Sequence, residues 1–300
     1  MLWLLVGSLN ALPTPASEQV RPRFVTSVDA VGIDVLVTDD GRPVRGLGAG
    51  DFRLLDNGIE QTIRVVDAEN LPLTVSVVLD VSDSVAGPTL DVLQSAARAL
   101  IRKLAPSDQV NVLTVADSIT LIADTAAPIA ERDDGLAGLV GAGGTRLFDA
   151  IWTALQLAAV SRAPRHRTVI VVFSDARDTT SWLGVDVIRD LLDRTEAVVF
   201  GVVPSVAVPA ASTSPWDRAA HLPDDKFLTS LTDASGGRLL LLKPTDDLSR
   251  TFESIIADMR SRYVLYYQPA GVDRAGAHKV RVTLTRRQGH VQARPMYVLP

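Results

Sequence analysis

Apolar segments and amphipathic segments alternate along the middle of the chain. Apolar runs rich in β-branched residues cover 74–79 and 168–173, and apolar side chains recur at helical spacing after Pro88. Strands that are apolar on both faces are typical of a sheet covered by helices on each side. The pattern therefore predicts an α/β fold with a doubly wound, mostly parallel sheet over residues 71–262. The expected strands are 74–79, 110–115, 119–122, 168–173, 197–203 and 239–242, and the expected helices are 88–104, a helix around 136, 147–159, 185–192, 226–234 and 248–259.

The segments on either side of this region have a β-type pattern. Short alternating runs within 24–66 are separated by Asp-Gly and Asn-Gly pairs at 40–41 and 57–58, which favour hairpin turns. Similar runs return in the last part of the chain. Neither segment has enough strands to bury a face alone, and chain termini usually lie close together. We therefore expect 18–70 and 263–300 to form one small β unit.

The chain begins with an apolar run. Residues 1–12 are too few to span a bilayer, but they resemble the core of a secretory signal peptide. Small residues follow, with Ala11 and Ala16 as cleavage points, although no positive charge precedes the run. We expect a signal peptide over 1–17 and an extracytoplasmic protein, periplasmic or secreted. The alternative is that the run is retained as a strand or helix of a cytoplasmic protein.

One long segment of the middle region has no sustained hydrophobic period. Residues 204–223 are rich in Pro, Ala and Ser. Segments of this composition form loops, and we expect this one to be mobile. The alternative is an ordered insertion beside the binding face.

Composition narrows the chemistry of the protein. The chain has 300 residues, 47% of them hydrophobic, and a net charge of -5 with a pI of about 5.4. This composition argues against disorder and against nucleic-acid binding, which requires a basic surface. The absence of cysteine excludes disulfides and thiolate metal sites, and none of the four histidines has zinc-site spacing. A metal site in this chain would therefore have to use oxygen ligands.

Motifs of common enzymes are missing. Asp80 follows an apolar strand, as the nucleophile of haloacid-dehalogenase-type phosphatases does, but the required second aspartate is replaced by Ser82. The chain has no Gly-x-Ser-x-Gly, Walker-type or dinucleotide-binding motif. We therefore expect a binding protein rather than an enzyme.

Three loops that follow predicted strands carry oxygen-bearing side chains. The first strand ends in Asp-Val-Ser-Asp-Ser, which contains Asp80, Ser82 and Ser84. A glycine-rich loop before a helix contains Thr145, and Asp175 follows the central apolar strand. Because ligands of such sheets bind at the carboxyl ends of the strands, these five side chains are expected to meet at one edge. Two carboxylates and three hydroxyls make a hard-oxygen site suited to Mg²⁺, Mn²⁺ or Ca²⁺.

These residues, in this order, resemble the von Willebrand factor type A (VWA) domain with a metal-ion-dependent adhesion site. That site combines Asp-x-Ser-x-Ser with a threonine from a second loop and an aspartate from a third. The resemblance implies that Ser82, Ser84 and Thr145 bind the cation directly. It also implies that Asp80 and Asp175 bind it directly or through water. Mg²⁺ is the expected ion, with Mn²⁺ and Ca²⁺ as alternatives.

The resemblance covers 71–262 and implies a Rossmann-like fold and a function in metal-dependent protein binding or adhesion. The cation would keep an open position for a carboxylate of the partner. The flanks, such as 35–52, are similar to VWA-related proteins of predicted bacterial exported sets, often acidobacterial. No nucleic acid and no transmembrane helix are expected. The alternative is a cytoplasmic scaffold or accessory subunit that docks a partner such as an ATPase. The partner, the physiological metal and the oligomeric state stay open.

Several residues near the motif have plainer interpretations. Asp149 and Asp178 are expected to cap a helix or to hydrogen-bond the metal ligands, and Asp83 occupies the variable position of the motif. The whole first turn has the alternative of being only a polar helix cap. Ala176 stands where the family often has glycine, which puts the backbone path of the third loop in question.

Overall fold

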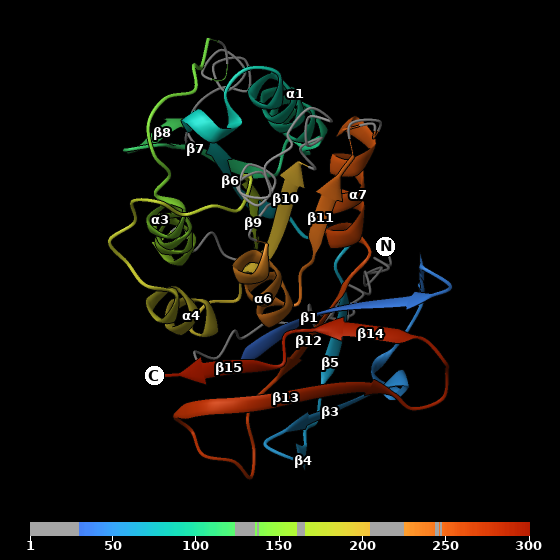
Figure 1. Cartoon of the computed structure of the whole chain (residues 1–300). Helices are drawn as coiled ribbons and strands as arrows, with labels where there is room; N and C mark the ends of the chain where they lie inside the picture. Colours follow the sequence, from blue (N-terminus) through green and yellow to red (C-terminus); the bar gives the residue numbers. More distant parts are fainter. Residues whose placement is uncertain are drawn as a thin grey trace, which may run out of the picture.

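The structure is a computed structural model in which an α/β part lies above a smaller β unit (Figure 1). It describes residues 30–123, 136, 138–160, 166–204, 225–243, 246 and 248–300. The expected signal peptide at 1–17 and nearly all of the 204–223 loop lie outside the described residues. Most neighbours of Leu136, around which a helix is expected, also lie outside them. Leu136 itself is a buried turn residue.

A six-stranded sheet forms the centre of the α/β part. Its strand order is β11-β10-β9-β6-β7-β8. Neighbouring strands are parallel except for the edge strand β8, which is antiparallel to β7. The α/β class expected from the apolar runs is confirmed. The strands are β6 (Leu73–Asp80), β7 (Gln109–Val115), β8 (Ile119–Ala123), β9 (Arg167–Phe173), β10 (Val198–Pro204) and β11 (Leu239–Leu242).

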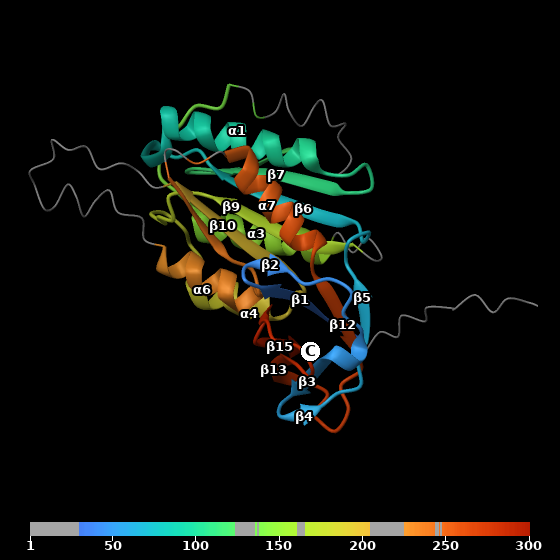
Figure 2. The ribbon, with the colours of Figure 1, turned by 90° about the vertical axis from the view of Figure 1, so that its right-hand side faces the viewer.

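Helices cover both faces of this sheet (Figures 1 and 2). On β6, Val77 and Leu79 belong to one hydrophobic core and Val78 to the other, because successive strand side chains point to opposite faces. The first core is covered by α1 (Pro88–Lys103) and α7 (Leu248–Arg260), and the second by α3 (Leu147–Val160), α4 (Val185–Asp193) and α6 (Lys226–Ser235).

No helix among the described residues is long and apolar enough to cross a membrane.

The β unit consists of two sheets that share a third core. One sheet has the order β14-β1-β12-β5, with β2 beside β1, and the other has the order β15-β13-β3-β4. In each sheet, strands from the start of the chain pair antiparallel with strands from its end, as β1 does with β12 and β3 with β13. The strands are β1 (Val31–Asp39), β2 (Arg42–Pro43), β3 (Phe52–Asp56), β4 (Ile59–Glu60), β5 (Arg64–Asp67), β12 (Tyr263–Tyr267), β13 (Gly276–Leu284), β14 (His290–Ala293) and β15 (Met296–Leu299).

Three buried arginines lie where the two parts meet. Arg294 Nη2 donates to the carbonyl of Leu192 in α4 at 3.1 Å, and Arg262 Nη1 donates to the carbonyl of Gly236, just after α6, at 2.8 Å. Arg167 Nη1 donates to a carbonyl in the last turn of α7 at 2.6 Å. Cations are favourable at helix C-termini because the unpaired carbonyls there carry partial negative charge. Arg167, at the amino end of β9, also pairs with Asp34 of β1, so the β unit is docked at the amino ends of the parallel strands and does not cover their carboxyl ends.

Candidate metal site

The three predicted loops meet at the carboxyl edge of the central sheet. Asp80 ends β6, and Asp175 follows the neighbouring strand β9. The first and second loops are joined by two backbone hydrogen bonds: Asp83 N–H donates to the carbonyl of Gly143, and Ala142 N–H donates to that of Val81, each at 3.0 Å. This edge is opposite the β unit.

The Asp-x-Ser-x-Ser loop holds its polar atoms close together. Asp80 is fully buried, and its Oδ1 accepts the N–H of Ser82 at 2.9 Å. Its Oδ2 accepts the hydroxyl of Ser174 at 2.5 Å. The hydroxyl oxygens of Ser82 and Ser84 are 3.1 Å apart. Ser82 is buried and Ser84 is exposed, so the loop presents hydroxyl oxygens from the interior out to solvent.

The second loop packs tightly against the first. A Cβ atom at Gly141 would lie 2.7 Å from Cβ of Ala86, so only glycine fits this approach. Thr145 is buried, and its N–H donates to Oγ1 of Thr179 at 2.7 Å. The Thr145 carbonyl accepts the N–H of Thr179 and of Thr180. The backbone of Thr145 is thus fixed by the segment that follows the third loop.

The third loop places Asp175 in a buried position, where its carboxylate contacts Arg177. Its Oδ1 accepts the N–H of Arg177 at 3.1 Å, and its Oδ2 lies 3.9 Å from Nε of Arg177. Ala176 has a φ of 67°, in the left-handed region that glycine adopts most easily. The loop therefore follows the path that a glycine would take, at the cost of some backbone strain in Ala176.

The strain at Ala176 predicts a graded response to substitution. Ala176→Gly relieves the left-handed strain but loses a buried methyl group, so its stability should stay within about 1 kcal/mol of wild type. Ala176→Val adds β-branching at positive φ and should cost about 1–3 kcal/mol. Thermal melts of the two variants test this expectation. A valine variant as stable as wild type would show that residue 176 does not adopt this conformation.

The electrostatics of Asp80 favour a nearby positive charge. Burial raises the pKa of Asp80 to about 6, hydrogen bonds from Ser174 and Ser82 partly oppose the shift, and the charge of Asp175 adds to it. No described Lys, Arg or His side chain forms an ion pair with Asp80. An ionised Asp80 at neutral pH is therefore a buried charge without a cationic partner.

Asp149 and Asp178 bind backbone rather than the predicted ligands. Asp149 accepts the N–H groups of Trp182 and Leu183 at 3.0–3.2 Å. Asp178 Oδ1 accepts the N–H of Phe148 at 3.2 Å, at the start of α3. The two carboxylates therefore hold the segment after the third loop against the first turn of α3 by hydrogen bonds. Among the described residues, the hydrogen bonds of both carboxylates go to this segment and to the start of α3.

Two large apolar side chains lie exposed on the loops of this edge. Trp182, whose N–H donates to Asp149, is 84% exposed, and Val140, just before Gly141, is 80% exposed. The guanidinium carbon of Arg146 lies 5.7 Å from the centre of the Trp182 ring, and Arg146 Nε donates to the carbonyl of Asp117 at 2.6 Å. The indole is thus held in place while its surface stays open to solvent. The sequence carries no signal that marks these residues.

A second polar cluster, which the sequence pattern does not reveal, is a structural feature of the β unit. Asp56 and His278 are fully buried and lie 2.9 Å apart, from Asp56 Oδ1 to His278 Nδ1. The hydroxyls of Tyr267 and Tyr297 donate to Asp56 Oδ2. Although an Asp–His pair is familiar from acid–base catalysis, a substrate has no access to atoms at zero exposure.

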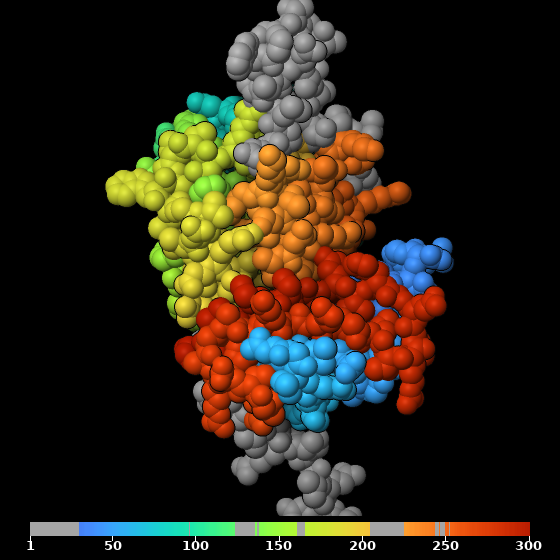
Figure 3. Space-filling view, turned by 60° about the horizontal axis from the view of Figure 1, so that its bottom comes forward, coloured from blue at the N-terminus to red at the C-terminus, as the bar shows by residue number. Residues whose placement is uncertain are grey.

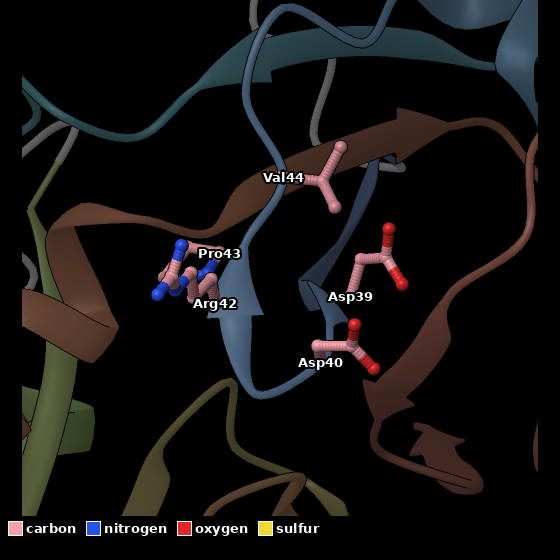
Figure 4. Close-up of a pocket in the computed structure, with 5 residues that line it drawn as sticks. All are labelled: Asp39, Asp40, Arg42, Pro43 and Val44. Atoms are coloured by element: carbon pink, nitrogen blue, oxygen red, sulfur yellow. The ribbon is translucent and has the colours of Figure 1, made fainter.

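An open hollow of about 450 Å³ lies beside the turn between β1 and β2 (Figure 4). It is lined by Asp39, Asp40, Arg42, Pro43 and Val44. Figure 4 shows the two carboxylates on one side of the turn and Arg42 on the other. The hollow lies in the β unit, away from the three loops, and adds no group to the candidate site.

Comparison with known proteins agrees with this architecture. Residues 75–177 match the family model of the von Willebrand factor type A domain. The solved structure of a von Willebrand factor type A protein from Catenulispora acidiphila superimposes with a TM-score of 0.52 at 11% identity, over 88% of this chain and 76% of that one. Proximal thread matrix protein 1 from the mussel byssus superimposes with a TM-score of 0.51 at 12% identity, and the match covers 69% of this chain and 51% of that one. No curated protein matches in sequence. Residues 75–177 therefore resemble a von Willebrand factor type A domain in sequence, and the α/β part has the fold of that domain.

Proposed function

We propose that this chain is a metal-ion-dependent protein-binding module. The observation that carries the proposal is the buried Asp80, which forms no ion pair with a described side chain, together with Asp175 and the paired hydroxyls of Ser82 and Ser84. Oxygen donors of this kind suit a hard divalent cation, with Mg²⁺ as the first choice. Among the described residues, no three His, Cys, Asp or Glu side chains lie together, so hydroxyls must complete the donor set.

The residues present fit such an ion. Ser82, Ser84 and Thr145 would bind it directly, while Asp80 and Asp175 would bind it directly or through water. Both Asp80 oxygens already accept hydrogen bonds from Ser82 and Ser174, which favours contact through water for that carboxylate. A bound cation would supply a positive charge with an open position for a carboxylate of the partner.

The surroundings of the site favour a protein as the partner. Tryptophan and arginine are enriched among residues that dominate protein interfaces, and Trp182 with Arg146 presents both side by side. Val140 adds a second exposed apolar side chain on the neighbouring loop. A partner that places a carboxylate on the cation would therefore also contact apolar surface.

The proposed function is tested by capture of binding partners with immobilised full-length protein in Mg²⁺ and in EDTA. We expect proteins that bind wild type in Mg²⁺, are released by EDTA and are absent from Asp175→Ala. The exposed α4 carboxylate provides a matched control, and Asp186→Ala should capture the same proteins as wild type. Capture that is equal in Mg²⁺ and EDTA would contradict the proposal.

Trp182 is expected to contribute to partner binding without affecting the ion. Trp182→Ala should weaken capture about tenfold or more, because truncation of a central aromatic residue is costly at interfaces. Its metal-induced change in melting temperature should equal that of wild type. Val160→Ala, which removes an 82% exposed side chain at the far end of α3, is the control. If both variants bind like wild type, the partner does not contact Trp182.

A further inference from the structure

The outer face of the β15-β13-β3-β4 sheet carries exposed positive charge. Alternation along β13 points His278 and Val280 into the core and leaves Lys279 and Arg281 exposed. Arg286 and Arg287 follow in the exposed turn after β13. None of these four cations, which we call the basic face, forms an ion pair with a carboxylate in the described part of the chain.

This charge is segregated from the rest of an acidic protein. Residues 274–300 contain six Lys and Arg residues and no Asp or Glu, although the whole chain has a net charge of -5. Only Arg294 of the six is used inside the fold, at the end of α4. The one acidic side chain of β4, Glu60, is paired with Arg53 across the sheet at 2.9 Å. Within this sheet, Lys279 and Arg281 therefore keep their positive charge.

Half-buried apolar side chains lie between the cations. Leu55 of β3 is the cross-strand partner of Arg281, and Met296 of β15 is the partner of Lys279. Cross-strand partners share a face, so charged and apolar groups alternate over the sheet. Figure 3 shows this end of the molecule covered by the C-terminal strands and by the β3–β4 region.

The basic face and the candidate metal site lie at opposite ends of the molecule. The β13 sheet lies on the far side of the β1 sheet from the α/β part (Figures 1 and 2). Asp80 and Asp175 lie at the carboxyl edge of the central sheet, whereas the β unit covers its amino edge. A surface that binds the basic face would leave the metal edge pointing away from it.

We propose that the basic face docks the protein on a membrane surface rich in anionic phospholipid headgroups. Cations near an anionic membrane each add to binding, and half-buried apolar side chains among them suit the lipid interface. Lys279 and Arg281 lie on the exposed side of a sheet and Arg286 and Arg287 in the turn that follows, an arrangement that matches an extended surface better than a single strand of a polymer. The inference does not depend on a metal ion.

Co-sedimentation with vesicles tests the proposal. The full-length protein should bind phosphatidylcholine vesicles that contain phosphatidylglycerol, should not bind vesicles of phosphatidylcholine alone, and should be released by high salt. The double variant Lys279→Glu/Arg281→Glu should bind at least about tenfold more weakly. The control Lys226→Glu/Lys243→Glu makes the same change in net charge at exposed positions of the α/β part and should bind like wild type.

Three results would overturn the proposal. They are equal sedimentation with both kinds of vesicle, equal loss in the control variant, and binding of soluble polyphosphate without binding of vesicles. Circular dichroism melts verify that the variants are folded. If Lys279→Glu/Arg281→Glu does not fold, Arg286→Gln/Arg287→Gln in the turn replaces it. This variant removes two positive charges instead of reversing them, and it should also bind vesicles at least about tenfold more weakly than wild type.

Discussion

Replacement of Asp56 by alanine is expected to destabilise the protein by about 3–5 kcal/mol, because three buried groups lose their common hydrogen-bond acceptor. Asp56 is fully buried and accepts from His278 Nδ1 at 2.9 Å, from the Tyr297 hydroxyl at 2.8 Å and from the Tyr267 hydroxyl at 3.1 Å. Burial is the largest cause that raises the pKa of both tyrosines, so their hydroxyls stay protonated donors at neutral pH. Alanine would leave three buried groups without their common acceptor.

Urea denaturation of the full chain measures this loss. Asp56→Asn keeps the side-chain volume and one acceptor oxygen, so we expect a smaller loss of about 1–2 kcal/mol. Asp273→Ala removes an exposed carboxylate of the same unit and should stay within about 0.5 kcal/mol of wild type. A loss of less than about 1 kcal/mol for Asp56→Ala would mean that the cluster does not hold the β unit together.

The elements of the α/β part could be predicted because each leaves a local pattern. The apolar run at 168–173 corresponds to β9 (Arg167–Phe173), and the helical spacing at 185–192 corresponds to α4 (Val185–Asp193). Both patterns arise from burial: the strand is covered on both faces, and the helix on one. Neighbours in sequence are enough to recognise such elements.

Contacts between distant residues leave no such pattern. Asp56 stands in an Asp-Asn-Gly sequence, which predicts a hairpin turn, and Asn57 and Gly58 do adopt positive φ. Its hydrogen-bond partner His278 is 222 positions away, and no local rule relates the two. The same holds for Arg262 and Arg294, since arginine usually indicates an exposed position, whereas here each is buried against the end of a helix.

In the candidate site, too, some residues could be predicted from local sequence and others could not. Asp80 and Asp175 each follow an apolar strand, so the rule for ligand sites at strand ends is enough to place them at one edge. The groups that fix them are not part of any motif. Ser174 donates to Asp80, and Thr179 holds the backbone of Thr145. The exposure of Trp182 also depends on the hydrogen bond from its N–H to Asp149 and is visible only in the folded chain.

Asp80→Ala is expected to remove most of the stabilisation that divalent ions give. Metal binding to the folded state stabilises it by about 2.7 kcal/mol when the free ion is at 100 times its dissociation constant. Because burial raises the pKa of Asp80 to about 6, the ionised carboxylate destabilises the metal-free fold at neutral pH. The metal-free variant should therefore be as stable as wild type or slightly more stable, and its gain on adding Mg²⁺ or Mn²⁺ should nearly vanish.

Asp175→Ala should behave in the same way, because it removes the second carboxylate and its repulsion of Asp80. Ser82→Ala and Thr145→Ala remove neutral oxygens, so they should reduce partner capture with less change in the metal-free stability. Thermal melts in EDTA and in Mg²⁺ separate these effects. Variants of the two aspartates that keep the full metal-induced shift would place the ion elsewhere.

The most direct test of the metal site is a calorimetric titration of Mg²⁺ and of Mn²⁺ into the metal-free, full-length protein. We expect a single ion to bind wild type, and we expect its affinity to fall at least about tenfold in Asp80→Ala and in Asp175→Ala, as it does when groups that hold or orient a metal are lost. Affinity that is unchanged in both variants, or a wild-type protein that neither binds the ion nor melts at a higher temperature in its presence, would contradict the proposed metal-dependent function.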